Sequence, residues 1–475
     1  MTLTIAIYIL LGLLIADLEF RRRSSGRPID AMTVFNCYYF VLFVFEPINV
    51  ICLGADATRQ RYAYETFGHG DSYTALSLVF SYVLFCFGYW LKSSNRSEPA
   101  AGSGRNSFPL TNSAYVAKLI FLFGALLTVI YVVQMGGVME VIYRAGEVRA
   151  GELVIESKYI FYRHFSQFSA DAFVLFCAVL IGKRVRKIKI TPADRQFLVC
   201  ALVFFVYYAL STGGRRPFIY PIILCFLVYT SVEGRPKIKF AVAAFALIFV
   251  FAGLGSMIGA VDPVASAPLL VEMARENDAN RWALLEIAYD NATQGLAESF
   301  IHFVGAQKAS LWQFGFLTDI VNLPRDFFPS QLFGFERSRH MYGETSEYFS
   351  GHALEEGMSG EETLGLHGYL LVNFGYVGMF ALFFFLGLFY KSIHIRFRPA
   401  ESKDAVGWLV YWWVVLAFFV YFRDGVLILV IKQQLTWWVT IALLVHYRAK
   451  RRASSTPIGG FGSINTNHVN QSWPA

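Results

Sequence analysis

Residues 366–390 read "LHGYLLVNFGYVGMFALFFFLGLFY", a stretch with no aspartate, glutamate, lysine or arginine. About 20 apolar residues in a helix cross the hydrocarbon core of a bilayer. Comparable apolar runs recur along the whole chain, and only 16% of its 475 residues are charged, whereas soluble proteins hold about 25%. The sequence therefore predicts an all-α, polytopic integral membrane protein, since helices satisfy their own backbone hydrogen bonds in lipid.

The apolar runs predict about eleven transmembrane helices and one large outer loop. Residues 1–260 hold helices one to eight, 261–365 form the loop, 366–446 hold helices nine to eleven, and 447–475 form a disordered cytoplasmic tail. The first run lacks a basic n-region and a cleavage site, so it is predicted to be retained as a span. The predicted helices cover residues 2–18, 31–53, 73–91, 114–133, 165–181, 196–210, 218–231, 240–260, 366–390, 405–422 and 426–446.

Lysine and arginine divide unequally between the two sets of connections. One set holds 24 of them and the short connections of the other set hold nine. Because cytoplasmic loops carry the excess of positive charge, the N-terminus is predicted to be periplasmic and the C-terminus cytoplasmic. The 261–365 loop, with sixteen acidic and six basic residues, then lies on the periplasmic side.

The stretch "STGGRRPFIYPIIL", residues 211–224, places Arg215 and Arg216 between two short apolar segments. Each segment covers only about 22 Å, so this turn is predicted to lie below the outer surface. Charged groups at that depth face a cavity or a charged ligand, and guanidinium groups bridge phosphate oxygens. We therefore predict a pyrophosphate site. The alternative is that both arginines extend to the lipid headgroups and anchor the turn.

Two further stretches on the predicted outer side carry candidate residues. "VIYRAGEVRAGELVIESKYIFYRH", residues 141–164, contains Arg144, Arg149 and Arg163, of which the first two are predicted to support the pyrophosphate site. The alternative is ordinary interfacial charge balanced by nearby glutamates. "ERSRHMYGETSE", residues 336–347, supplies Arg339 for the phosphate and His340 as a general base; the alternative is a solvated helix face.

Other titratable residues have weaker support. Glu344 and His367 follow His340 as candidate catalytic groups, and His302, among apolar residues, is predicted to be a packed core histidine. Glu46 and Asp171 lie within spans, where either could pair with an arginine across the bundle. There is no metal-ligand spacing and no nucleotide-binding fingerprint, so neither a metal nor a cofactor is predicted.

On three features the chain resembles the bacterial O-antigen polymerases, the oligosaccharide repeat unit polymerase family. These are the outer turn "STGGRRPF", the long outer loop before the last three spans, and a motif at Asn373, Phe374, Gly375 and Gly378 that is similar to the family's Asn-Phe-Gly-x-x-Gly helix start. Members often carry a carboxylate shortly before this motif. Here residues 364–375 read "LGLHGYLLVNFG", and the nearest candidates are His367 and the earlier Glu361 and Glu362.

The resemblance implies a metal-independent, inverting glycosyltransferase with a GT-C-like polymerase and ligase architecture in the bacterial inner membrane. Its donor would be a growing glycan on undecaprenyl pyrophosphate and its acceptor a lipid-linked repeat unit. A chain-length regulator is a candidate membrane partner, and no nucleic acid is expected.

Two other functions remain as alternatives. An O-antigen ligase would use the same donor and topology with a lipid A core acceptor. A transporter or flippase of lipid-linked oligosaccharide would place charged residues along a path through many spans. A membrane acyltransferase, which needs a histidine deep within a span, fits less well, because His164 and His367 lie at predicted span edges.

Overall fold

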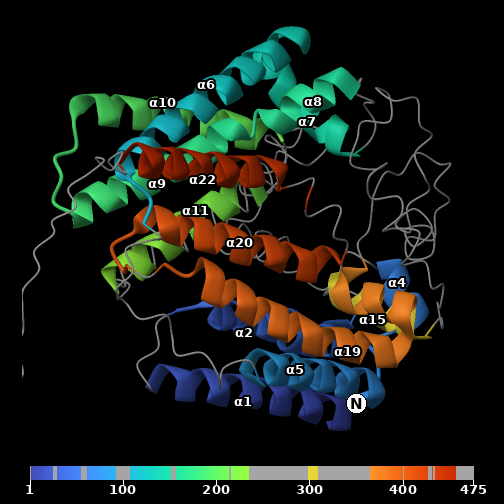
Figure 1. Cartoon of the computed structure of the whole chain (residues 1–475). Coiled ribbons are helices and arrows are strands. Elements are labelled where there is room, and N and C mark those ends of the chain that lie inside the picture. Colours follow the sequence, from blue (N-terminus) through green and yellow to red (C-terminus); the bar gives the residue numbers. More distant parts are fainter. Residues whose placement is uncertain are drawn as a thin grey trace, which may run out of the picture.

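The structure is a computed structural model that describes residues 2–24, 29–54, 61–91, 107–150, 157–212, 216–234, 298–308, 364–399, 401–425, 431 and 434–455, some helix ends as backbone only. About 89% of the described chain is helical, and this part contains no strand. The long helices lie side by side across the view in Figure 1. The prediction of an all-α polytopic membrane protein is therefore confirmed.

Eight segments of the described chain are long and apolar enough to cross a membrane. They are α1 (Thr2–Ser24); α2 (Ala31–Phe40), η1 (Val41–Phe45) and α3 (Glu46–Leu53) as one span; α5 (Ser72–Leu91); α6 (Leu110–Gln134); α8 (Ser157–Phe165) with α9 (Phe168–Val185); α10 (Pro192–Ser211); α19 (Gly365–Phe397); and α20 (Ala405–Asp424).

The remaining described helices are shorter or more polar. They are α4 (Arg61–Phe67), α7 (Val138–Ala150), α11 (Arg216–Glu233), α15 (Glu298–Lys308) and α22 (Leu435–Ser455). Of these, α11 contains a shorter apolar helix in the place of the predicted seventh span. The predicted 240–260 span lies outside the described residues, as does the start of the 426–446 span, so the count of eleven stays a prediction.

Several connections that are rich in lysine and arginine meet at one end of the bundle, which we call the basic end. Arg186, after α9, lies 3.7 Å from Glu401, which precedes α20. The backbone N–H of Phe108, before α6, donates to Asp404 at 3.2 Å, and the Arg448 guanidinium of α22 lies over the Phe108 ring. The opposite end, which we call the loop end, holds the start of α19 together with α4 and α15 (Figure 1).

Three helices that start at the basic end have side-chain caps. Asp30 and Thr33 form a capping box on α2, and Thr191 and Asp194 form another on α10, where Pro192 takes the first helical position. Asp404 accepts the Gly407 backbone N–H at the start of α20. Such caps satisfy backbone donors that the first helical turn leaves unpaired.

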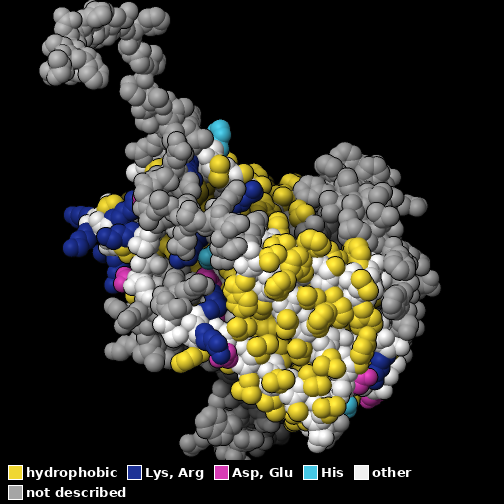
Figure 2. All heavy atoms as spheres, turned by 60° about the horizontal axis from the view of Figure 1, so that its bottom comes forward, with side chains coloured by type: hydrophobic (Ala, Val, Ile, Leu, Met, Phe, Trp, Pro, Cys, Tyr) yellow, Lys and Arg dark blue, Asp and Glu magenta, His cyan; other side chains and the backbone are white. Residues whose placement is uncertain are grey.

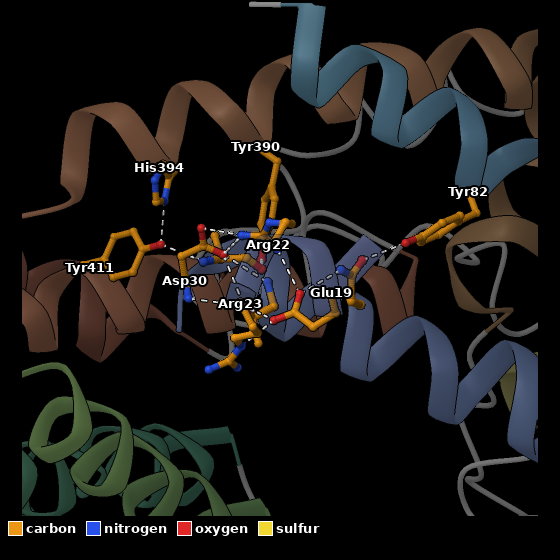
Figure 3. Close-up of polar contacts among 11 residues, drawn as sticks. Glu19, Arg22, Arg23, Asp30, Tyr82, Tyr390, His394 and Tyr411 are labelled. Atoms are coloured by element: carbon orange, nitrogen blue, oxygen red, sulfur yellow. Dashed lines mark hydrogen bonds and ion pairs between the residues drawn. The ribbon is translucent and has the colours of Figure 1, made fainter. Parts of the chain in front are cut away.

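A buried polar network joins α1, α2, α19 and α20 at the basic end (Figure 3). Arg22 contacts both carboxylate oxygens of Asp30, at 2.5 and 2.6 Å, and the Glu19 carboxylate at 3.0 Å. The Tyr411 hydroxyl accepts the backbone N–H of Ala31 and lies 2.8 Å from His394 Nδ1. Burial makes these charges costly unless they are paired, and the network pairs them.

Close helix packing fixes the centre of the bundle. A Cβ added to Gly88 of α5 would overlap the carbonyl oxygen of Phe384, and one added to Gly387 of α19 would overlap that of Phe85. Small residues of this kind let membrane helices approach closely. The outer surface carries many exposed apolar side chains, and Figure 2 shows them as a broad apolar area with lysine and arginine gathered along one edge. This distribution suits a lipid-facing surface.

Candidate functional site

The helix α15 lies within the sequence of the predicted large loop and is packed into the loop end. Its residues 299–306 are buried, and His302 is 1% exposed, which confirms the expected core histidine. The Lys308 ammonium donates to the carbonyl oxygen of Phe67, and the Thr74 hydroxyl donates to the Gln307 side chain. This part of the loop sequence therefore contacts the membrane helices directly.

Asp71 sets the charge at this contact. Its carboxylate accepts the backbone N–H and the hydroxyl of Thr74, at 2.9 and 3.1 Å. Burial raises the pKa of Asp71, but these hydrogen bonds, one from Tyr73 and the charge of Lys308 outweigh burial, so the pKa lies below its ordinary value. A fixed negative charge thus stands beside Lys308 at the loop end.

The two arginine-bearing stretches of the sequence meet in the structure. Arg163, in α8, donates from Nη2 to the carbonyl oxygen of Thr212, at 3.1 Å. Thr212 ends α10 and directly precedes the turn that carries Arg215 and Arg216. Directly before α9, four residues after Arg163, the Gln167 side chain accepts a hydrogen bond from the Tyr208 hydroxyl at 3.3 Å. The first half of α8–α9 is therefore tied to the end of α10 at two points.

The other predicted pyrophosphate ligands have different outcomes. Arg144 lies on α7, which packs against α10, and its side chain is 44% exposed and paired with Glu140 one turn earlier. Arg149 lies in the last turn of α7 and Arg216 starts α11, both described as backbone only. Arg215 and Arg339 lie outside the described residues. Their contact with phosphate remains a prediction.

Of the three predicted catalytic groups, only His367 lies within the described residues; His340 and Glu344 lie outside them. His367 is 1% exposed and occupies the first turn of α19. Its Nε2 lies 3.1 Å from the Tyr39 hydroxyl, and the rings of Phe43 and Phe383 stand 4.3 Å away. The imidazole is thus held among aromatic rings, and its catalytic role stays a prediction.

The motif at 373–378 lies inside α19, at the kink where two helical segments meet, so one helical segment does begin within the motif. The helix begins at Gly365, and Gly375 interrupts it with φ 62° and ψ −174°, a backbone conformation essentially restricted to glycine. A Cβ at Gly378 would overlap the Phe374 side chain. Gly375 therefore produces a kink in α19 eight residues after His367, and Gly378 leaves room there for the Phe374 side chain.

The intramembrane carboxylates also have defined places. Glu46 is fully buried at the start of α3, directly after the π-helical segment η1. Asp171 is 3% exposed on α9, and its polar neighbours among the described side chains are Thr436 and Trp437 of α22. Across the described chain, no group of three or more His, Cys, Asp or Glu is arranged to hold a metal ion.

This geometry defines a class of protein: a multi-pass helical membrane protein whose arginine-bearing segments meet at one end of the bundle. Residues 2–258, which span α1 to α11, match the family model described as O-antigen polysaccharide polymerase Wzy. The match covers more than half of the chain, so the protein belongs to this family. No curated protein and no solved structure matches the chain.

Family membership confirms the resemblance seen in the sequence and identifies a polymerising, glycosyltransferase-like enzyme of polysaccharide biosynthesis.

One residue of the site was not among the predicted ligands. Arg163 was noted only as part of a charged cluster, although it, Gln167 and Asp171 are spaced by four residues. That spacing is a signal for polar side chains on one side of these helices; Arg163 and Gln167 contact α10, and Asp171 contacts α22.

Proposed function

We propose that this polymerase joins oligosaccharide repeat units carried on undecaprenyl pyrophosphate, at the periplasmic face of the bacterial inner membrane. The contact from Arg163 to Thr212 supports this proposal, because it joins the stretch that carries Arg144 and Arg149 to the turn that carries Arg215 and Arg216. The contact holds two chain segments that carry arginines against each other, and recognition of a diphosphate would use guanidinium groups from both.

The chemistry follows from the leaving group. The hydroxyl oxygen of the acceptor sugar bonds to the anomeric carbon of the donor glycan as the bond from that carbon to the phosphate oxygen breaks. Undecaprenyl pyrophosphate leaves with the electron pair, and a base takes the hydroxyl proton. Fixed guanidinium groups stabilise the charge that develops on the phosphate, so the reaction proceeds without a metal, and a single displacement inverts the anomeric centre.

The residues have separate roles in this proposal. Arg215 and Arg216 hold the pyrophosphate, with Arg144, Arg149 and Arg339 as further ligands. Arg163 is a positioning residue, because its guanidinium acts through the Thr212 carbonyl oxygen. His340 is proposed as the base, with Glu344 and then His367 as the next candidates.

The test is to delete the gene in its host, complement it with variants and resolve the surface polysaccharide by size. Loss of the ladder, with one repeat unit still attached to lipid A core, is expected on deletion and with Arg215→Ala. Arg163→Ala should shorten or abolish the ladder, whereas Arg163→Lys should restore part of it. Arg186→Ala, at the basic end, is the matched control and should complement fully.

Two results would contradict the proposal. If no repeat unit reaches the core and long lipid-linked polymer accumulates, the protein transfers finished polymer instead of building it. If the ladder is unchanged on deletion, the chain does not polymerise this polysaccharide.

A further inference from the structure

Unpaired polar atoms gather where α9, α20 and α22 pack together. Five buried side-chain atoms, on described residues that are at most 3% exposed in these helices or at Gln434 directly before α22, have no hydrogen-bond partner. They are Asp171 Oδ2, Trp413 Nε1, Gln434 Oε1, Thr436 Oγ1 and Thr440 Oγ1. Buried polar groups in proteins are nearly always paired, with protein atoms or with a bound molecule.

Ring contacts and neighbours place these groups together. Asp171 lies beside Thr436 and Trp437, and Thr440 follows Thr436 by one turn on the same face of α22. The Trp437 ring is stacked 5.8 Å from Trp413 and lies 6.3 Å from Tyr220 of α11. We call this group of residues on α9, α11, α20 and α22 the polar seam.

The polar seam begins one helical turn from the arginine turn. Tyr220 follows Arg216 by four residues on α11, a rise of about 6 Å. On the facing helix, Asp171 lies two turns beyond Arg163, and the Phe173 ring stacks on Phe205 of α10 at 5.0 Å. The seam is thus continuous with the end of the bundle where the pyrophosphate site is proposed.

At the basic end, buried polar side chains that hold helices together are paired with one another. There Arg22, Asp30, Glu19, Thr33 and Asn36 are joined by direct hydrogen bonds. In the polar seam the Asp171 carboxylate interacts with the Thr436 and Trp437 side chains, but its Oδ2 is left without a hydrogen bond among the described residues. Polar groups of this kind beside indole and phenol rings match a ligand that has both hydroxyl groups and an apolar ring face, which is the chemistry of a sugar.

We propose that the polar seam is a saccharide subsite, in which Asp171 accepts a hydrogen bond from a sugar hydroxyl of the lipid-linked repeat unit and Trp437 packs against the sugar ring. This inference rests on the proposed function, because it deepens the description of the same substrate. Asp171 then fixes the orientation of the saccharide next to its diphosphate, and the unpaired atoms of α22 hold further hydroxyl groups.

The experiment measures polymer formation by the full-length protein in proteoliposomes supplied with the host's own lipid-linked repeat unit. Asp171→Asn keeps the side-chain volume and should raise KM about ten- to a hundred-fold, the range expected for loss of a hydrogen bond to a charged group, with kcat changed far less. Asp171→Leu should raise KM further. Asp404→Asn alters a buried carboxylate at the basic end that already accepts the backbone N–H groups of Gly407 and Phe108, and it should leave both constants unchanged.

A second measurement separates binding from folding. The free repeat-unit oligosaccharide, released from its lipid, should change the tryptophan fluorescence of the wild type and not that of Asp171→Leu, at equal thermal midpoints. If Asp171→Asn lowers the midpoint but leaves KM and oligosaccharide binding as in the wild type, the seam is only a structural contact and the inference fails. If the wild type forms no polymer, the proposed function itself is contradicted, independently of the fluorescence result.

Discussion

The guanidinium of Arg22 contacts both carboxylate oxygens of Asp30, at 2.5 and 2.6 Å, and each residue is only 7% exposed. Removing one partner leaves the other charge buried, which costs about 3–5 kcal/mol. Asp30→Asn should therefore lower the thermal midpoint of the purified protein by several degrees, as followed by tryptophan fluorescence in detergent. Asp17→Asn is the control, because it breaks an ion pair whose side chains are 49% and 76% exposed, and it should leave the midpoint nearly unchanged.

The same pair predicts a dependence on acid. Burial raises the pKa of Asp30, but the charge and hydrogen bonds of Arg22 outweigh burial and hold this pKa below its ordinary value. The stability that Asp30 contributes is therefore fully present above its unfolded pKa of about 3.9 and is lost as pH falls through the lower folded pKa. The difference in midpoint between wild type and Asp30→Asn should shrink over that acidic range. A difference that stays constant would contradict the ion pair.

Asp404 has a pH dependence of the opposite sign. It is 1% exposed, and burial raises its pKa to about 6 despite hydrogen bonds from Gly407 and Phe108. A raised carboxyl pKa gives stability that is present below the unfolded value of about 3.9 and lost as pH rises through about 6. Between pH 4 and 7 the wild-type midpoint should therefore fall relative to Asp404→Asn, which does not titrate. Parallel midpoint curves for the two proteins would show that the carboxyl titrates normally.

The spans follow from the apolar runs because membrane crossing is a matter of length and composition. Runs predicted at 31–53 and 73–91 appear as Ala31–Leu53 and Ser72–Leu91. Helix ends were less predictable, because polar first turns lie outside the apolar run. For example, α10 starts at Pro192, capped by Thr191, whereas its apolar run starts at residue 196. The π-helical segment η1 depends on tertiary packing and has no composition signal, whereas the kink falls on Gly375 of the motif noted in the sequence.

The candidate site was predictable only in part. Sequence placed two arginine stretches on one side, and the Arg163 contact to Thr212 brings them together. The polar seam could not be predicted, because Asp171 and Thr436 are 265 positions apart and only the packing of α9 on α22 makes them neighbours. The basic-end network could not be predicted either, because Asp30 lies more than 360 positions before His394 and Tyr411 in the chain (Figure 3).

Gly387 and Gly88 predict a steric limit at the crossing of α5 and α19. A Cβ at either position would overlap a carbonyl oxygen of the facing helix, and backbone atoms cannot move aside as a side chain can. Gly387→Ala should thus lower the thermal midpoint and the amount of protein in the membrane. Gly12→Ala is the control, because its new Cβ would meet only the side chains of Val44 and Phe40, at 3.1 and 3.3 Å. Equal midpoints for the two variants would rule out the close crossing.

The kink at Gly375 links the backbone to the proposed activity. Its φ of 62° and ψ of −174° would cost another residue about 1–3 kcal/mol, so Gly375→Ala should straighten α19 or destabilise it. Because the segment before the kink carries His367 and packs against α15, its direction sets how α15 sits at the loop end. We expect Gly375→Ala to shorten the polysaccharide ladder by more than its loss of protein explains.

Val377→Ala is the matched control for the kink, since Val377 lies two residues further along, is 84% exposed and has helical neighbours. It should leave both ladder and midpoint as in the wild type. If Gly375→Ala also gives a wild-type ladder at a wild-type midpoint, α19 does not require the glycine conformation. The kink would then have no part in holding α15 against the helices that carry the site.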